Sequence, residues 1–382
     1  MSTSITSLVP DAFKALDVVS RELIGFIPSV TRDAELDRVS LNQTLRSFAT
    51  PINTAGKDIV ASMVLPPAVV QAVGNRSMTI SKLRAFPFSW TGELQGAADK
   101  GPGYLNMRQD QIAQAMRAAV LEIETDLAAV AYQNASRAFG TAGTTPFGTN
   151  LGESAQIKRI LDDNGAPLSE RALIVNTTAG AALRTLLNNP LNANMSLATD
   201  VTRQGVILDL NGFKFREAAQ VPTVTRGTGA SYTSSAAGFA VGVTSIPIIT
   251  GSGTVLAGDV VTFAGDTNRY VVATGVAAPG TIVLALPGLR QAIPAAATAM
   301  TIGANFSANV GFSRNAIALA TRLPIEPAEG DQAILSEVIT DDRSGLSFEL
   351  RAYPGYRMTH YEVGIAWGVM AVKAEHIAIL LG

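Results

Sequence analysis

The sequence predicts an α+β protein in which an all-β module is inserted into a mixed host domain. Between residues 222 and 305 the chain is dominated by Gly, Thr, Ser, Ala and Val, and it carries only five charged side chains there. On both sides of this segment, helical and strand-like hydrophobic patterns follow one another. A composition that changes sharply at both ends indicates a separate β-rich module within a host.

The composition favours a chain that assembles with copies of itself. Its 382 residues favour two or three domains. Hydrophobic residues make up 47% and charged residues only 16%, against about 25% in a typical soluble protein. So few charges predict that other copies cover much of the surface.

Several classes of function and site are disfavoured by the same composition. A net charge of −2 argues against a dedicated nucleic-acid binder, and the absence of cysteine excludes disulfides and thiolate sites. The N-terminus shows no signal-peptide pattern, and outside residues 222–305 no uncharged apolar run approaches about 20 residues. We therefore expect no membrane partner.

Residues 1–48 are predicted to form an N-terminal arm, with a short helix over 10–23 and a polar stretch over 31–42. Two interpretations stay open, a frayed terminus and an arm that becomes ordered against a partner. Residues 49–105, which are rich in proline, are predicted to form an extended two-stranded loop.

Within this loop, residues 84–93 alternate as a strand does, with an aromatic stripe on one side. The stripe could stack on nucleic-acid bases, but few basic residues are interleaved with it, so a core or a subunit interface is favoured. The subunit-interface candidates are Arg84, Phe86, Phe88, Trp90 and Glu93.

A long spine helix is predicted in residues 106–150, which form a peripheral domain. No Gly or Pro occurs from Met107 to Phe139, and apolar residues recur at spacings of three and four. Asn106 is the expected N-cap, and Glu124 is placed on the polar side. A helix of about 30 residues would span roughly 45 Å, which suits a strut.

The remaining host is predicted as an axial α/β domain in two parts, residues 151–221 and 306–340, separated by the inserted β domain at 222–305. Helices are expected over 154–163 and 178–187, and strands over 172–175 and around Phe213 and Phe215. Residues 341–382 are predicted as a long β-hairpin and a C-terminal strand, because apolar and polar residues alternate there. Pro354-Gly355 is the expected centre of the turn.

No catalytic, cofactor-binding or metal site is predicted. The two histidines, His360 and His376, show no metal-ligand spacing. The pairs Asp162-Asp163 and Asp341-Asp342 are interpreted as solvated turn residues, although a weak Ca²⁺ site at a turn stays open. We therefore do not expect an enzyme.

Three stretches, in this order of elements, resemble the major capsid protein of tailed double-stranded DNA phages, which has the HK-ninety-seven fold. They are ILDDNGAP running into LIVN (residues 160–167 and 173–176), GFSRNAIALATRLP (311–324) and VMAVKAEHIAIL (369–380). The inserted module resembles the P-twenty-two-like coat branch, although this insert is short and its barrel is expected to be reduced.

The resemblance implies pentamers and hexamers in an icosahedral virion shell, assembled in the host cytoplasm around DNA that is bound only non-specifically. It also implies a scaffolding protein and a portal protein as partners. Some distant relatives crosslink a loop lysine, but no matching carboxylate motif accompanies Lys57, so no crosslink is predicted. The alternative is a carbohydrate- or receptor-binding virion protein with a β module, although that module offers few aromatic residues for stacking on sugars.

Overall fold

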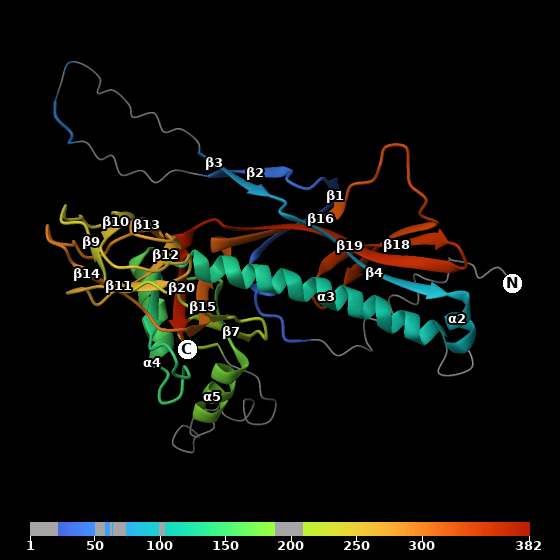
Figure 1. The fold of residues 1–382 in the computed structure, drawn as a ribbon, viewed down its shortest axis with the longest axis horizontal. Coiled ribbons are helices and arrows are strands. Elements are labelled where there is room, and N and C mark those ends of the chain that lie inside the picture. Colours follow the sequence, from blue (N-terminus) through green and yellow to red (C-terminus); the bar gives the residue numbers. More distant parts are fainter. Residues whose placement is uncertain (1–21, 50–57, 62, 64–73, 99–103, 188–208) are drawn as a thin grey trace.

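The computed structural model describes residues 22–49, 58–61, 63, 74–98, 104–187 and 209–382. A single long helix, α3 (Tyr104–Gln133), runs along the molecule and joins two groups of strands (Figure 1). The C-terminal hairpin packs along one part of α3, and a second sheet begins where α3 ends. The predicted strut is therefore present.

Helix α3 forms because its apolar residues recur along one face and no Gly or Pro interrupts it. Ile112, Met116, Ala119, Ile123 and Leu127 on this face are all fully buried. The prediction of Asn106 as N-cap was wrong, because the helix begins two residues earlier. It also ends at Gln133, before strand β5 (Arg137–Gly140), which pairs with the C-terminal strand.

The prediction that Glu124 lies on the polar side of α3 was wrong. Its side chain is fully buried and accepts hydrogen bonds from the backbone N–H groups of Gly25 (3.3 Å), Phe26 (3.0 Å) and Ile27 (2.7 Å). Burial raises the pKa of Glu124, although the three N–H groups and the charge of Arg216 oppose this rise. This carboxyl group thus anchors the N-terminal segment to α3.

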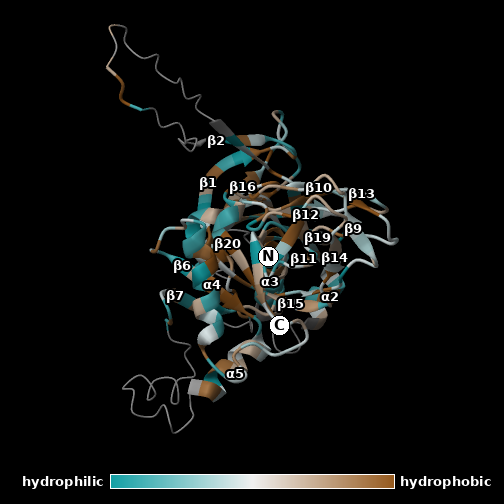
Figure 2. Ribbon diagram, turned by 90° about the vertical axis from the view of Figure 1, so that its left-hand side faces the viewer, coloured by the Kyte–Doolittle hydropathy of each residue, from teal (hydrophilic) through white to brown (hydrophobic). Residues whose placement is uncertain are grey.

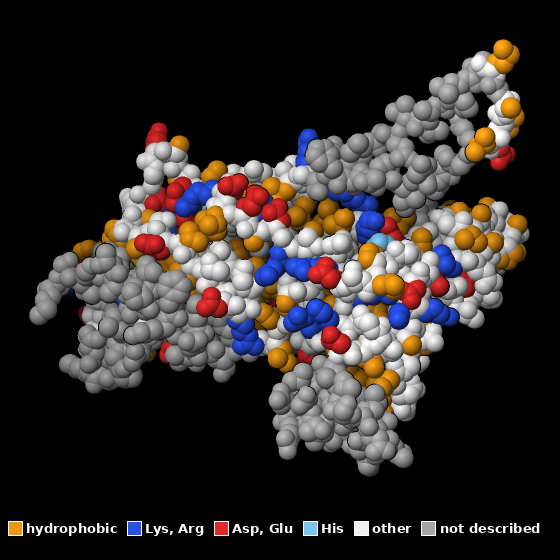
Figure 3. Space-filling model, turned by 180° about the vertical axis from the view of Figure 1, so that it is seen from behind, with side chains coloured by type: hydrophobic (Ala, Val, Ile, Leu, Met, Phe, Trp, Pro, Cys, Tyr) orange, Lys and Arg blue, Asp and Glu red, His pale blue; other side chains and the backbone are white. Residues whose placement is uncertain are grey.

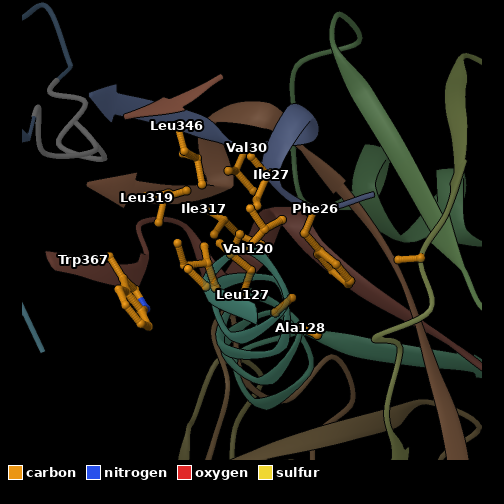
Figure 4. Packing of buried hydrophobic residues seen from close by; sticks show 14 of the residues in the cluster. Phe26, Ile27, Val30, Val120, Leu127, Ala128, Ile317, Leu319, Leu346 and Trp367 are labelled. Atoms are coloured by element: carbon orange, nitrogen blue, oxygen red, sulfur yellow. The ribbon is translucent and has the colours of Figure 1, made fainter. Parts of the chain in front are cut away.

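A six-stranded sheet lies against α3, and Figure 4 shows apolar side chains of α3, of this sheet and of the N-terminal segment packing together. The long strand β19 (Met358–Ala371) forms its axis and pairs with three neighbours. The other strands are β1 (Thr31–Val39), β4 (Lys82–Thr91), β16 (Ile317–Pro324), β17 (Leu335–Asp341) and β18 (Leu346–Gly355).

The C-terminal hairpin, β18 and β19, confirms the strand pattern but not the predicted turn. Gly355 pairs with Met358, so the loop consists of Tyr356 and Arg357, and Arg357 takes a φ of 54°. Pro354 lies within β18 and pairs with Thr359. The alternation is as predicted, since Tyr361, Val363, Ile365 and Trp367 all enter the core around α3.

A twelve-stranded sheet contains the remaining host strands and the strands of the 222–305 segment. Its host strands are β5, β6 (Arg171–Val175), β7 (Phe213–Glu217), β15 (Phe306–Ser313) and β20 (Ile377–Leu381). Strand β8 (Thr223–Val224), at the start of the 222–305 segment, pairs with β15. Helix α4 (Gly152–Asp163) packs on this part, and α5 (Thr177–Leu187) follows β6. Helices α4 and α5 and strand β6 lie within two residues of their predicted positions, and β7 contains Phe213 and Phe215 as predicted.

The remaining strands close into a ring, because each pairs antiparallel with two others in the order β11-β14-β9-β10-β13-β12 and back to β11. A barrel of this kind leaves no open sheet edge within the ring. Its interior is a separate apolar cluster that includes Tyr232, Tyr270 and Phe263. The strands are β9 (Tyr232–Ser234), β10 (Ser245–Ile249), β11 (Val260–Phe263), β12 (Arg269–Thr274), β13 (Gly280–Leu284) and β14 (Ala299–Ile302).

This ring is not detached from the host. Strand β12 also pairs with β5, where Arg269 lies opposite Ala138 and Tyr270 opposite Arg137. Because β5 pairs on its other side with β20, the backbone hydrogen bonds run from the ring into the host. Six short strands suffice to close the ring.

The N-terminal arm differs from its prediction where it is described. Residues 31–39 form β1, which pairs parallel with β16; most of its residues are exposed, and its ribbon is largely hydrophilic in Figure 2. The two-stranded excursion consists of β2 (Thr44–Ala49) and β3 (Gly74–Thr79), so it begins before residue 49. The predicted helix over 10–23 and Lys57 lie outside the described residues, apart from residues 22 and 23.

Candidate subunit interfaces

Strand β4 carries four of the five interface candidates, and its inner side belongs to the chain's own core. Phe88 stacks on Tyr361 with ring centroids 5.2 Å apart. Trp90 is 4% exposed, and its Nε1 donates to Oε1 of Gln111 on α3 at 2.5 Å. Trp90 is therefore part of the chain's own core, because its side chain packs toward α3.

Arg84 lies on the same side of β4 as the aromatic stripe, where its exposed side chain donates to Glu122 on α3 at 3.2 Å. Leu83, on the opposite side of the strand, is 39% exposed and is where another molecule could make contact. Glu93 is exposed but lies on helix α2 (Gly92–Ala98), so the structure does not place it beside Arg84 on the strand. Interface roles for Arg84 and Glu93 stay predictions.

Lys82 connects this edge to α3. Its Nζ lies 3.0 Å from Glu122 and 2.9 Å from Asp126, and 5.6 Å from the ring centre of Trp367. Burial opposes the charge of Lys82, but the hydrogen bonds to Asp126 and Glu122 raise its pKa. Trp367 Nε1 donates to the same Asp126 at 2.9 Å. These contacts within one chain hold the edge of the sheet against α3.

The excursion between β2 and β3 carries the most exposed apolar side chains. Ile59 and Met63 are fully exposed, and Val60 is 73% exposed. Figure 3 shows these hydrophobic atoms at the far end of the excursion, away from the body. Exposed apolar clusters of this kind are typical of surfaces that contact another protein.

A second exposed apolar corner lies at the other end of the molecule, where the β18–β19 turn meets α2. Tyr356 is 91% exposed, Leu94 is 55% exposed and Met358 is 37% exposed. The corner is held together by the Gly92 N–H, which donates to Arg357 O at 3.1 Å. Sequence reasoning did not single out either patch, although isolated apolar residues beside turn residues and prolines were a visible signal.

A charge network holds the loop after β16 against the sheet. Arg351 pairs with Glu349, Glu326 and Asp331, and Arg38 of β1 lies 2.7 Å from both Glu349 and Glu326. Burial opposes the charge of Arg351, but its hydrogen bonds to Tyr353 and Glu349 raise its pKa. This network also explains why the polar stretch after Thr31 becomes a strand of the sheet.

The paired carboxylates were predicted to be solvated turn residues, but three of them, Asp162, Asp163 and Asp341, have partners within the chain. Asp162 lies 2.6 Å from the buried Arg171, and Asp163 lies 3.0 Å from the buried Arg137. Asp341 is 1% exposed and accepts from Ser344 Oγ at 2.7 Å, whereas Asp342 is exposed.

Within the described residues, no group of three or more His, Asp or Glu side chains is placed to hold a metal ion. His376 is mostly buried, which lowers its pKa, and His360 lies beside Tyr353 with ring centroids 6.4 Å apart. None of the helices in the described part of the chain combines the length and apolarity needed to cross a membrane.

No family model matches the sequence, and no curated protein is detectably similar to it. The structure is similar to a chain from the capsid of the Cyanophage P-SCSP1u, with a TM-score of 0.50 and 11% identity over 96% of this chain and 90% of that one. It also resembles a chain from Mycobacterium phage Che8 (TM-score 0.47, 10% identity, 95% and 93% covered). A chain from the capsid of a native GTA particle is similar with a TM-score of 0.47 and 8% identity, over 95% of this chain and 91% of that one.

At these identities the likeness concerns the fold alone, and the cyanophage chain carries it. This chain therefore has a phage capsid fold over nearly its whole length.

Proposed function

We propose that this chain, which has a phage capsid fold, is a major capsid protein of a tailed phage, with the HK-ninety-seven arrangement and an inserted barrel domain. The single observation that carries the proposal is the likeness to the cyanophage capsid chain over 96% of this chain. A likeness of that extent includes α3, both sheets and the region of the barrel. The role is structural and needs no catalytic group.

The distribution of exposed apolar side chains supports assembly into closed rings. One patch (Ile59, Val60 and Met63) projects from the excursion, and the other (Leu94, Tyr356 and Met358) lies at the opposite end of the molecule. Two different patches on one chain favour head-to-tail contacts, which close into rings when the rotation between copies permits it. Pentamers and hexamers in an icosahedral virion shell around DNA follow from this proposal.

The expected partners are other copies of the chain, a scaffolding protein and a portal protein, with DNA held only non-specifically. Assembly in the host cytoplasm is part of the same proposal. The low fraction of charged residues, 16%, accords with surfaces that copies of the chain cover.

Sedimentation followed by negative-stain microscopy of the purified protein tests the proposal. We expect capsomers or closed particles, with or without a scaffolding protein. The double variant Ile59→Ser/Met63→Ser should stay folded and lose particle formation, because both side chains are exposed within one chain. Val241→Ser, at a site on the barrel that is 60% exposed, is the matched control and should assemble.

Monodisperse monomer at every concentration and salt condition would count against the shell. Small, discrete oligomers would instead favour the carbohydrate- or receptor-binding alternative. If the double variant formed normal particles, the excursion would not be needed for assembly, but the proposal of a shell would stand.

A further inference from the structure

A cavity of about 630 Å³ lies where the barrel meets the host, and the proposed shell function gives it no role. Its walls come from β5, the first turns of α4 and the turn before β12. Three arginines line it, Arg137, Arg159 and Arg269, against a single carboxylate, Glu153. The cavity is therefore positively charged.

The positive charge is only partly neutralised within the described residues. Glu153 Oε2 accepts the backbone N–H of Phe147 at 2.6 Å, so this carboxylate is already engaged. Arg137 is paired with Asp163, but neither Arg159 nor Arg269 has an ion-pair partner in the described part of the chain. Two guanidinium groups at the cavity are thus available to a ligand.

Arg137 is the buried arginine of this cavity. It is 4% exposed, its Nη1 donates to Asn268 Oδ1 at 3.2 Å, and its buried Nε has no partner. Burial lowers the pKa of Arg137, and the charge of Arg290 adds to the lowering, while Asp163 opposes it. An arginine held this way, beside further positive charge, keeps the local potential favourable for an anion.

The start of α4 adds to the same field. Gly152, Glu153 and Gln156 of its first turns line the cavity, and Leu151 at the N-cap makes no side-chain capping hydrogen bond. The N-terminal end of a helix of 12 residues carries a partial positive charge, although the Gly152 N–H already donates to Asn150 Oδ1 at 2.8 Å. The N-terminal end of α4 and the arginines therefore both attract anions.

We propose that this cavity binds an oxyanion, a phosphate or a carboxylate, held chiefly by Arg159 and Arg269. Guanidinium groups bind such planar or tetrahedral oxyanions through paired N–H donors. A cavity with walls on three sides admits a small anion or one protruding side chain. A duplex presents its phosphates on a wide, continuous surface, which disfavours nucleic acid as the source.

Isothermal titration of the purified protein with inorganic phosphate, at constant ionic strength, tests this site independently of assembly. We expect saturable binding that weakens at least tenfold in Arg159→Gln and in Arg269→Gln. Lys158→Gln is the matched control, because it removes the same charge from the neighbouring position on α4, outside the cavity. It should bind phosphate as the unmodified chain does.

A hexamer of glutamate then distinguishes the sources of the oxyanion. Competition with phosphate would identify a side-chain carboxylate as the ligand, and lack of competition would identify free phosphate. The site is refuted by an absence of saturable binding, by equal weakening in Lys158→Gln, or by displacement of phosphate by a short DNA duplex more effectively than by the peptide.

Discussion

At the scale of single residues, Glu124 shows how one buried carboxyl group organises a segment that is distant in sequence. Three consecutive backbone N–H groups, of Gly25, Phe26 and Ile27, all donate to it. The side chains of Phe26 and Ile27 are fully buried beside α3 (Figure 4). Glu124, together with Arg117 of α3, which pairs with Glu22, thus holds the chain where the N-terminal arm enters the fold.

Replacing Glu124 with alanine should destabilise the folded chain by at least about 3 kcal/mol, because three buried N–H donors each lose an acceptor worth about 1–3 kcal/mol. Urea unfolding followed by circular dichroism measures this. Glu122→Gln, which affects a partly exposed pair on the same helix, should cost about 0–1 kcal/mol. Equal effects of the two variants would contradict the anchoring role.

The charge of Glu124 should make stability depend on pH. Its raised pKa means that the folded chain binds the proton more tightly than the unfolded chain does. This contribution to stability is therefore full below the unfolded value of about 4.3, and it is lost as the pH rises through the raised pKa.

Glu124→Gln keeps the shape and one acceptor but cannot titrate, so its unfolding free energy should lack this dependence. Urea unfolding of both proteins between pH 4 and pH 8 gives the comparison. The unmodified chain should lose stability relative to the variant as the pH rises. A relative gain would show that the three N–H bonds outweigh burial.

At the scale of elements, α3 packs against the six-stranded sheet along its length and leads into the twelve-stranded sheet at its end. Its middle packs against β4 and β19, and its end leads directly into β5, where the two parts of the twelve-stranded sheet meet. A bend in α3 would therefore displace the hairpin relative to the barrel. The shape of α3 therefore affects the relative positions of the hairpin and the barrel, as well as the stability of the helix itself.

Ala119→Pro should abolish soluble, assembly-competent protein. Proline inside a helix removes a hydrogen bond and clashes with the preceding turn, at about 3 kcal/mol or more, and Ala119 is fully buried in the middle of α3. Ala119→Gly is the control and should cost about 1 kcal/mol. Soluble yield, thermal melts and sedimentation measure both variants, and normal particles from Ala119→Pro would refute the continuous strut.

At the scale of the whole molecule, the pairing of β12 with β5 joins the barrel to the host, and Val260 and Val271 of the barrel pack in the core around α3. The barrel has its own apolar cluster and a closed ring of strands, which favours independent folding. The pairing of β12 with β5 ties it to the end of α3. The barrel can thus be stable by itself while its orientation depends on the host.

Residues 222–305 expressed alone should give a β-type circular dichroism spectrum and a cooperative melt, because ring closure and the core lie within the segment. We expect a melting temperature below that of the full chain, since the contact with β5 is lost. A disordered fragment would show that β5 is required for folding.

The sequence by itself determined the elements whose patterns are local. The spacing of apolar residues along α3, the alternation in β18 and β19, and the change of composition around the barrel each reflect contacts within one element or one segment. Such patterns arise because one face of a helix or strand is buried. They are readable without knowing which element covers that face.

Only the tertiary structure decided the pairing of those elements. Asp341 and Glu124 are polar and yet buried, because their hydrogen-bond partners come together only in the folded chain. Trp90 belongs to the core because α3 lies beneath β4, and the polar stretch after Thr31 becomes a strand because β16 offers it an edge. These outcomes depend on contacts between residues distant in sequence, which no local pattern encodes.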